Sequence, residues 1–417
     1  MIKVKKVLII GSVWPEPESS AAGSRMMSLI SIYLNSGWNV IFASPAGHSD
    51  YCADLETLNV EQVSIKMNDS SFDVFLKELK PECVVFDRFM VEEQFGWRVS
   101  KNCRDALRIL NTEDLHFLRK ARELAFKSSR ICEVSDFLIS DDAKREIASI
   151  LRCDLSLIIS LYEMDLLKNL FKIDEKLLQY HPFLTDVTTE ETRATWPPFA
   201  ERQNFIAIGN FLHSPNYDSI RYLKEEIWPQ IRRELPDAKL NIYGAYPSPK
   251  VWQLNNVKEG FLVIGRAKSA LEVMKQARVC LAPLRFGAGL KGKLFDAMLC
   301  GTPSVTTPVG AEAMHGNLPW NGFIRHTALE ISQAAVKLYK DEEVWNSSVE
   351  NGLEILNQCY NKDFFTSKLN RRIDYLSENL KTHRLHNFTG AMLMHHTLKS
   401  TEYMSRWIEE KNRKVNA

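Results

Sequence analysis

A glycine-rich turn holds the residues whose types and spacing best fit a chemical role. Residues 282–312 read APLRFGAGLKGKLFDAMLCGTPSVTTPVGAE, so a short apolar run ending at Pro283 leads through glycines into a helical pattern. Glycines let a ligand come close to the backbone, and the start of a helix attracts anions. Arg285, Lys291 and Lys293 add full positive charges. The segment predicts a phosphate site, with a merely solvated basic turn as the alternative.

Asp296 lies about one turn inside the helix that follows the glycines. A carboxylate there can accept hydrogen bonds from the hydroxyl groups of a ribose. A phosphate site beside a ribose acceptor indicates a nucleoside diphosphate as the ligand.

The segment resembles the donor motif of GT-B glycosyltransferases of family 4. It is closest to the branch that reads R-x-G-x-G-x-K-x-K, then an acidic residue and G-x-P-x-V-x-T. Upstream stretches such as IAIGNFLHSPNYDSI and LPDAKLNIYGAYP follow in the order of that family, so the resemblance covers about residues 205–312. It implies a UDP-sugar or GDP-sugar as donor and transfer with retention of configuration. The donor-binding residues implied in this half are Gly209, His213, Gly265, Arg266, Arg285, Gly289, Leu290, Lys291, Lys293 and Asp296.

One departure from the family concerns its pair of glutamates spaced eight residues apart, which would fall on Ala288 and Asp296. In the family the first glutamate touches the transferred sugar and the second touches the ribose. The ribose contact therefore carries over to Asp296, whereas the sugar contact does not carry over to Ala288. A neighbouring branch tolerates this loss, so the departure alone does not indicate an inactive enzyme.

Two further turns of this half face the cleft in GT-B proteins. His213 or Arg221, after the strand expected at residues 205–208, could reach the donor phosphates; capping and packing of the next helix is the alternative for His213. Gly265 and Arg266 resemble the family's base-binding edge.

The first half offers two candidate segments. The loop at 11–25 runs from a strand into a helix, and the resemblance makes Gly23 and Ala22 its residues nearest the donor phosphates and the acceptor. An ordinary loop with a capped helix is the alternative. Asp87-Arg88 follows another expected strand and is a weaker candidate, with a surface ion pair as the alternative.

His116 and Asp114 are the catalytic candidates, because they follow the strand expected at 107–110. Ligands of doubly wound sheets bind beyond the carboxyl ends of the strands. His116 matches a histidine that contacts the donor sugar in many family members, and Asp114 could orient it or bind an acceptor hydroxyl. In the alternative, Thr112 caps a helix and the cluster is structural.

No metal-binding pattern stands out. The sequence has no Asp-x-Asp after a strand, and His395-His396 point to different helix faces. We therefore predict no catalytic metal and no cofactor besides the donor, with lysines and backbone amides neutralising the leaving diphosphate.

These residues need a scaffold of alternating strands and helices. The pattern predicts an α/β protein with two doubly wound, Rossmann-like domains of the GT-B fold, which face each other across a cleft while C-terminal helices cross back. The predicted domains are 1–185, 186–204 as linker, 205–375 and a helical tail at 376–417. The expected strands are 7–10, 40–43, 83–86, 107–110, 137–139, 157–159, 205–208, 240–243, 261–264, 279–283 and 304–306.

The composition limits the possible binding partners and the cellular compartment of the protein. The 417 residues contain 53 Lys and Arg against 52 Asp and Glu, a net charge of +1, so strong attraction of the whole protein to nucleic acid or to an acidic membrane is excluded, though attraction through a local patch is not. No uncharged apolar stretch is long enough to span a membrane. The eight cysteines have no C-x-x-C pair and indicate reduced thiols and a cytoplasmic protein. Tyr403 and Trp407 share a helix face that we expect to dock on the protein, with partner or membrane contact as alternatives.

The sequence therefore predicts a metal-independent glycosyltransferase that is similar to hexosyltransferases. Its acceptor is open: a glycan, a lipid-linked precursor, a small molecule, a protein or RNA. One alternative is a sugar-nucleotide epimerase of the same fold, which would need acid–base carboxylates in the cleft. The other alternative is a protein that binds nucleotide sugars without catalysis.

Overall fold

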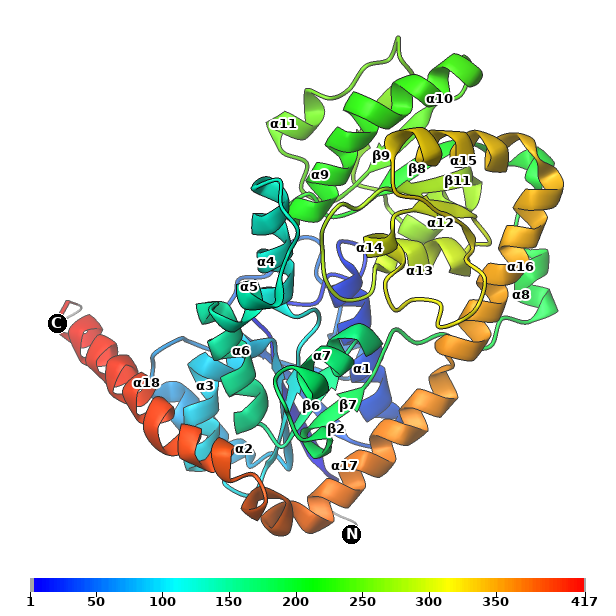
Figure 1. The fold of residues 1–417 in the computed structure, drawn as a ribbon. Helices are drawn as coiled ribbons and strands as arrows, with labels where there is room; N and C mark the ends of the chain where they lie inside the picture. Colours follow the sequence, from blue (N-terminus) through cyan, green and yellow to red (C-terminus); the bar gives the residue numbers. More distant parts are fainter. Residues whose placement is uncertain (1–3, 416–417) are drawn as a thin grey trace.

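The computed structural model of the protein describes residues 4–415, except the side chains of residues 396–398, 414 and 415. Over these residues the chain forms two parallel sheets, of seven and six strands, each covered by helices on both faces. Figure 1 shows the two domains stacked, with the last long helices running from the second domain back to the first. The predicted α/β architecture of two doubly wound domains is confirmed.

The first sheet has the strand order β3-β2-β1-β4-β5-β6-β7 and pairs its strands in parallel. Its central strands are short, mostly apolar runs that are buried on both faces, as expected for a parallel sheet, whereas the edge strand β3 is partly polar and exposed. The strands are β1 (Lys6–Ile10), β2 (Asn39–Ser44), β3 (Glu61–Ser64), β4 (Cys83–Asp87), β5 (Leu107–Asn111), β6 (Leu155–Ile158) and β7 (Leu178–Tyr180).

Two hydrophobic clusters cover the faces of this sheet. One unites helices between β3 and β7, and the other packs α1 against residues of the distant C-terminal part, such as Leu369. The helices are α1 (Ala21–Asn35), α2 (Ser71–Leu79), α3 (Phe89–Asn102), α4 (His116–Lys127), α5 (Val134–Leu138), α6 (Asp141–Arg152) and α7 (Leu161–Asn169), with 3₁₀ turns at Glu56–Leu58 and Glu175–Leu177.

The second sheet has the order β10-β9-β8-β11-β12-β13. Its strands are β8 (Gln203–Ile208), β9 (Leu240–Tyr243), β10 (Phe261–Gly265), β11 (Ala277–Ala282), β12 (Ser304–Thr306) and β13 (Gly322–Ile324). Its helices are α9 (Ser214–Tyr222), α10 (Trp228–Glu234), α11 (Pro249–Trp252), α12 (Ala270–Gln276), α13 (Gly292–Leu299), α14 (Pro308–Ala311), α15 (Ala328–Lys340) and α16 (Glu342–Cys359), with a π turn at Leu223–Ile227. The connection between the domains holds α8 (Glu190–Ala194) and a 3₁₀ turn at Phe199–Glu201.

The return to the first domain begins earlier than the boundary at residue 375 suggested. Helix α17 (Lys362–Leu385) runs along the first domain, where Leu369 and Ile373 join the core around α1. The boundary at 375 therefore falls inside one helix that already belongs to the first domain's packing (Figure 1).

One expected strand is wrong. Residues 137–139 lie in and after helix α5, which Glu133 and Asp136 begin with a capping box. Leu138 and Ile139 are exposed, so this apolar run has no place in the buried sheet. The pattern also missed β3, β7 and β13, which are short and lie at sheet edges; β3 and β7 also contain polar residues.

The tail helix α18 (Phe388–Val415) does pack on α3 and α6 of the first domain, but not through the face we expected. Tyr403 and Trp407 are 66% and 61% exposed, so the prediction that they dock on the protein is wrong. Polar contacts hold the helix instead. No helix of residues 4–415 is both long and apolar enough to cross a membrane.

Candidate active site

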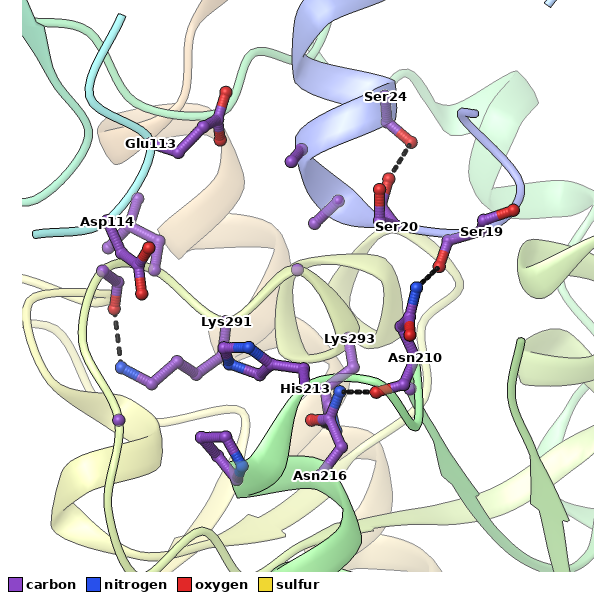
Figure 2. A pocket seen from close by; sticks show the side chains of 18 of the residues that line it. Ser19, Ser20, Ser24, Glu113, Asp114, Asn210, His213, Asn216, Lys291 and Lys293 are labelled. Atoms are coloured by element: carbon purple, nitrogen blue, oxygen red, sulfur yellow. Dashed lines mark hydrogen bonds between the residues drawn. The ribbon is translucent and has the colours of Figure 1, made fainter. Parts of the chain in front are cut away.

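A cleft of about 500 Å³ lies between the two domains, at the carboxyl ends of both sheets. Segments that follow β1 and β4 to β11 line it, which is where doubly wound sheets place ligands. Figure 2 shows the two walls, with Glu113 and Asp114 of the first domain opposite Lys291 and Lys293 of the second. The cleft therefore joins the two candidate regions that lie far apart in the sequence.

The glycine-rich turn makes close contact with the first domain at two of its glycines. Gly289 has a φ of +62°, which favours glycine, and a Cβ at this position would lie 2.8 Å from the Cβ of Asp114. A Cβ at Gly292 would clash with Ala21. The sequence suggested that these glycines let a ligand come close to the backbone. In the structure, Gly289 and Gly292 let residues of the first domain come close.

Lys291 and Lys293 line the cleft and are the two cations of this turn. Lys291 Nζ donates to the carbonyl of Gly289 at 2.6 Å, and Lys293 Nζ donates to Oδ1 of Asn216 at 2.7 Å. Within the described part of the chain, neither forms an ion pair with a carboxylate. Burial lowers the pKa of each lysine to about 8, because the charged form loses its hydration. Among the described residues the two buried ammonium groups thus lack a direct carboxylate partner, although the more distant charges of Glu312, Glu163 and Asp114 act favourably on Lys291. An anionic ligand would supply the direct partner.

Asp296 also lines the cleft, from the second turn of α13. Burial raises the pKa of its carboxyl to about 7, and the charge of Glu18 adds to this rise. Near neutral pH the group can therefore accept or donate a hydrogen bond, and either suits a hydroxyl.

His213 and its neighbours form the turn after β8. His213 occupies the N-cap position of α9, but its side chain makes no capping hydrogen bond and lines the cleft instead. Asn216 donates to the carbonyl of Asn210 at 2.8 Å while it accepts from Lys293. Gly209 leaves room for this pair, since a Cβ there would come within 2.8 Å of Lys293 Nζ.

His116 opens helix α4 and faces the cleft beside Asp114. Its Nε2 lies 3.7 Å from Oδ1 of Asp114, and burial lowers the pKa of the imidazole to about 4, so the ring is neutral at pH 7. Burial opposes the charge of Asp114, but its ion pair with Arg119 keeps the pKa of that carboxyl below its usual range. The first-domain wall of the cleft therefore carries the neutral imidazole of His116 and the carboxylate of Asp114, whose charge is balanced by Arg119.

The capping alternative for this cluster is wrong about Thr112. Its hydroxyl donates to the carbonyl of Leu157 at 2.9 Å. The free amides at the start of α4 are taken instead by two buried glutamates: Glu146 accepts from His116 and Phe117, and Glu163 accepts from Leu115. The oxygens of these two side chains accept the otherwise unpaired amides of the helix start, and so they fix the position of His116.

Glu113 and Glu163 are cleft-region residues that sequence reasoning did not single out. Glu113 lines the cleft and is paired with Arg25 at 3.1 Å; burial raises the pKa of its carboxyl. Glu163 lies behind the wall and accepts from the amide of Gly289 at 2.9 Å, so it joins the two domains. Burial raises its pKa to about 8. Glu163 follows β6 closely, and the strand-end rule could have found it.

Four predicted residues lie outside the lining. Arg285 is held by Asp218 at 2.7 Å, and Arg221 pairs with Glu225 on the surface. Gly23 packs under the backbone of Glu16, whereas its neighbour Ala22 does line the cleft. Gly265 accepts a backbone hydrogen bond from Gly244.

Arg266 and Arg88 do line the cleft. The guanidinium of Arg266 lies 3.6 Å from the ring centre of Tyr51, so the suggested base-binding edge also carries a contact between the domains. Arg88 lies 3.7 Å from Asp87, but their side chains are only 23% and 10% exposed, so this is not the surface ion pair of the alternative. The described residues contain no group of three side chains arranged to hold a metal ion.

Comparison with solved structures shows the GT-B fold over nearly the whole chain. Sucrose-phosphate synthase from Thermosynechococcus elongatus aligns with a TM-score of 0.63 and 15% identity, over 89% of this chain and 99% of that one. HepE from Anabaena, solved with UDP and glucose, aligns with a TM-score of 0.65 and 12% identity, over 89% and 99%. A glycosyltransferase from Rickettsia africae gives 0.64 and 10%, over 90% and 100%. At these identities the likeness establishes the fold.

A family model matches the sequence of the second domain. Residues 202–341 match the family described as glycosyl transferases group 1. Among curated protein sequences, none matches the chain. The family match and the fold together confirm that the protein is a GT-B glycosyltransferase. Its membership of family 4 stays a prediction.

Proposed function

We propose that the protein transfers a sugar from a nucleoside-diphosphate sugar to a hydroxyl-bearing acceptor, and that the diphosphate binds at Lys291 and Lys293. The observation that carries this proposal is the pair of buried ammonium groups without carboxylate partners at a glycine-rich helix start. A diphosphate would supply both missing charges, and its binding would raise the pKa of both lysines. The glycosyltransferase match of this same domain agrees with that ligand.

The donor is a UDP-sugar or a GDP-sugar in this proposal. HepE structures contain UDP-glucose, which makes that compound a sensible first probe without assigning the base or sugar here. Asp296 would bind the ribose hydroxyls, and His116 would contact the transferred sugar from the other wall. The proposed setting is the cytoplasm, where free thiols such as the buried Cys280 and Cys300 stay reduced.

In the proposed reaction the acceptor oxygen attacks the anomeric carbon while the bond from that carbon to the β-phosphate oxygen breaks. The proton of the acceptor hydroxyl passes to a donor phosphate oxygen, and the sugar keeps its anomeric configuration. The lysines stabilise the negative charge that develops on the leaving diphosphate, without metal. Contact between the walls excludes water and aligns the acceptor.

The test begins with a thermal-shift screen of nucleotide sugars, followed by calorimetry on the best ligand. Lys291→Ala should weaken donor binding by roughly 1–3 kcal/mol, the range for a charge-assisted hydrogen bond. Lys250→Ala, an exposed lysine of α11, is the matched control and should bind normally. Unchanged affinity of Lys291→Ala for every nucleotide would contradict the assignment.

Product analysis separates the remaining alternatives. Incubation of the donor with candidate acceptors should give a mass increase of one sugar on the acceptor and free nucleoside diphosphate. Interconversion of the donor sugar without acceptor would identify an epimerase. Tight binding with neither product would identify a non-catalytic sensor.

A further inference from the structure

Helix α18 buries several polar side chains against the first domain and leaves its largest apolar side chains exposed. Its inner side meets the first domain through polar groups: Glu402 pairs with Lys101 at 3.1 Å, and Glu409 lies 3.6 Å from Arg98. Ser405, almost fully buried, accepts from Arg98 at 3.3 Å. Apolar residues of the helix are buried only in part, as at Leu393, Met394 and Ile408. A surface helix usually buries its apolar stripe and exposes its polar face, whereas here the largest apolar side chains stay exposed.

The outer side carries large apolar side chains. The exposed residues are Phe388, Met392, Tyr403, Met404 and Trp407, with exposures from 47% to 76%. Phe388 and Met392 are four residues apart, as are Tyr403 and Trp407, so each pair lies along one side of the helix. We call these five residues the outer stripe. Figure 1 shows α18 at the outer edge of the first domain, away from the second domain, so the stripe lies far from the cleft.

The charges around the outer stripe are mainly basic. Residues 399–417 contain five Lys and Arg against three Asp and Glu. Two of the three acids, Glu402 and Glu409, are turned toward α3, where their side chains are 22% and 13% exposed. They also pair with Arg406 and Arg413 of the same helix. This leaves Lys399 and Lys411 as the exposed basic groups without such a pair among the described side chains. Lys411 extends over the ring of Trp407, with Nζ 5.4 Å from the ring centre. The outward surface therefore combines aromatic rings with basic groups.

We propose that α18 binds the surface of an anionic lipid membrane through the outer stripe, lying parallel to the membrane plane. Tyr and Trp favour the boundary between headgroups and acyl chains, and Lys and Arg beside them attract anionic lipids. The stripe follows one convex helix rather than a groove, so it fits a flat lipid surface better than a protein segment that needs a pocket. Membrane binding in this proposal is independent of the sugar transfer.

Vesicle flotation with the full-length protein tests this proposal. The protein should float with vesicles of phosphatidylcholine containing about 30% phosphatidylglycerol, and much less with pure phosphatidylcholine. Raising the salt from about 0.1 M to about 0.5 M should weaken binding, because it screens the attraction. Equal binding to both vesicles, or no binding to either, would overturn the proposal.

Paired variants assign the binding to the helix. Trp407→Ser with Tyr403→Ser should reduce vesicle partitioning at least about tenfold, since two aromatic side chains no longer insert. Lys411→Gln should reduce it roughly fivefold, as expected for one basic residue near an anionic surface. The matched control is Tyr375→Ser with Trp252→Ser, which removes two exposed aromatic side chains elsewhere.

Two outcomes would reassign the surface. If the control variant loses as much binding as the α18 variant, the stripe has no special role. If light scattering shows a dimer that the Trp407→Ser, Tyr403→Ser variant dissociates, the stripe is a contact between two copies of the chain, and the lipid proposal is wrong. Melting curves of all variants, which should match that of the unmodified protein, show that the exposed substitutions leave the fold intact.

Discussion

The two walls of the cleft handle charge in opposite ways. On the first-domain wall each arginine has an acidic neighbour: Arg25 with Glu113, Arg88 with Asp87, and Arg119 with Asp114. On the second-domain wall the two lysines of the glycine-rich turn have only neutral acceptors among the described residues.

The difference indicates which wall has its charges paired when no ligand is bound. A buried charge is costly unless it is paired, and the first wall meets that condition by itself. On the second wall, Lys291 and Lys293 gain a directly paired anion only when a ligand supplies one. We infer that the first wall orients neutral hydroxyl groups, whereas the second wall holds the charged part of the donor.

The largest effect should come from pushing the walls apart. Gly292→Ala adds a methyl group against Ala21, so the domains can no longer approach fully. A misplacement of about 1 Å can cost on the order of a hundredfold in rate, and we expect that loss in kcat. Gly47→Ala is the control, because nothing lies within 4 Å of a Cβ there. Normal turnover of Gly292→Ala would show that closure of this contact is not required.

The next effect tests the first wall. His116→Ala should lower kcat roughly tenfold or more while nucleotide affinity stays nearly constant, because a transition-state contact is lost without touching the phosphates. His326→Ala removes an exposed histidine and serves as control. A variant that melts earlier but turns over normally would make His116 a structural helix-start residue.

The pH dependence tests the second wall. Both lysines have a pKa of about 8, so they carry protons below that pH and lose them above it. Affinity for a nucleotide sugar, whose phosphates do not titrate in this range, should fall about tenfold between pH 8 and 9. Lys293→Arg keeps its charge and should flatten the decline. Constant affinity up to pH 10 would contradict the role of the lysines.

The smallest effect is expected from metal removal. If the lysines neutralise the leaving diphosphate, EDTA should leave turnover unchanged. Loss of activity with recovery on adding a divalent ion would show that the second wall needs a metal to complete its charge. Activity before and after chelation, with the metal content of the sample measured, decides this point.

Much of the fold could be read from local pattern. Mostly apolar runs marked β1, β4, β5 and β8, because strands buried on both faces have few polar positions; Arg108 in β5 is an exception. The run at 137–139 misled the interpretation because helix and strand cannot be distinguished over three apolar residues. The edge strand β3 was not predicted because half of its residues are polar, which is possible in a strand that has only one neighbouring strand.

The candidate site was predictable in part for the same reason. Lys291, Lys293, Asp296 and His213 follow strand ends, so their place at the cleft follows from the rule for parallel sheets. Arg285 lies beside the same turn, but it forms an ion pair with Asp218 of α9. The two residues are far apart in the sequence, so their spacing does not predict this pair.

What the sequence determined by itself is therefore the alternation of strands and helices, the glycine-rich turn and the type of ligand it suits, because these depend on residues close together in the chain. Only the tertiary structure decided which charges are paired, how closely Gly292 meets Ala21, that Glu163 links the domains, and which side of α18 faces outward. Those properties depend on residues brought together from distant segments, since burial and pairing are set by packing rather than by order along the chain.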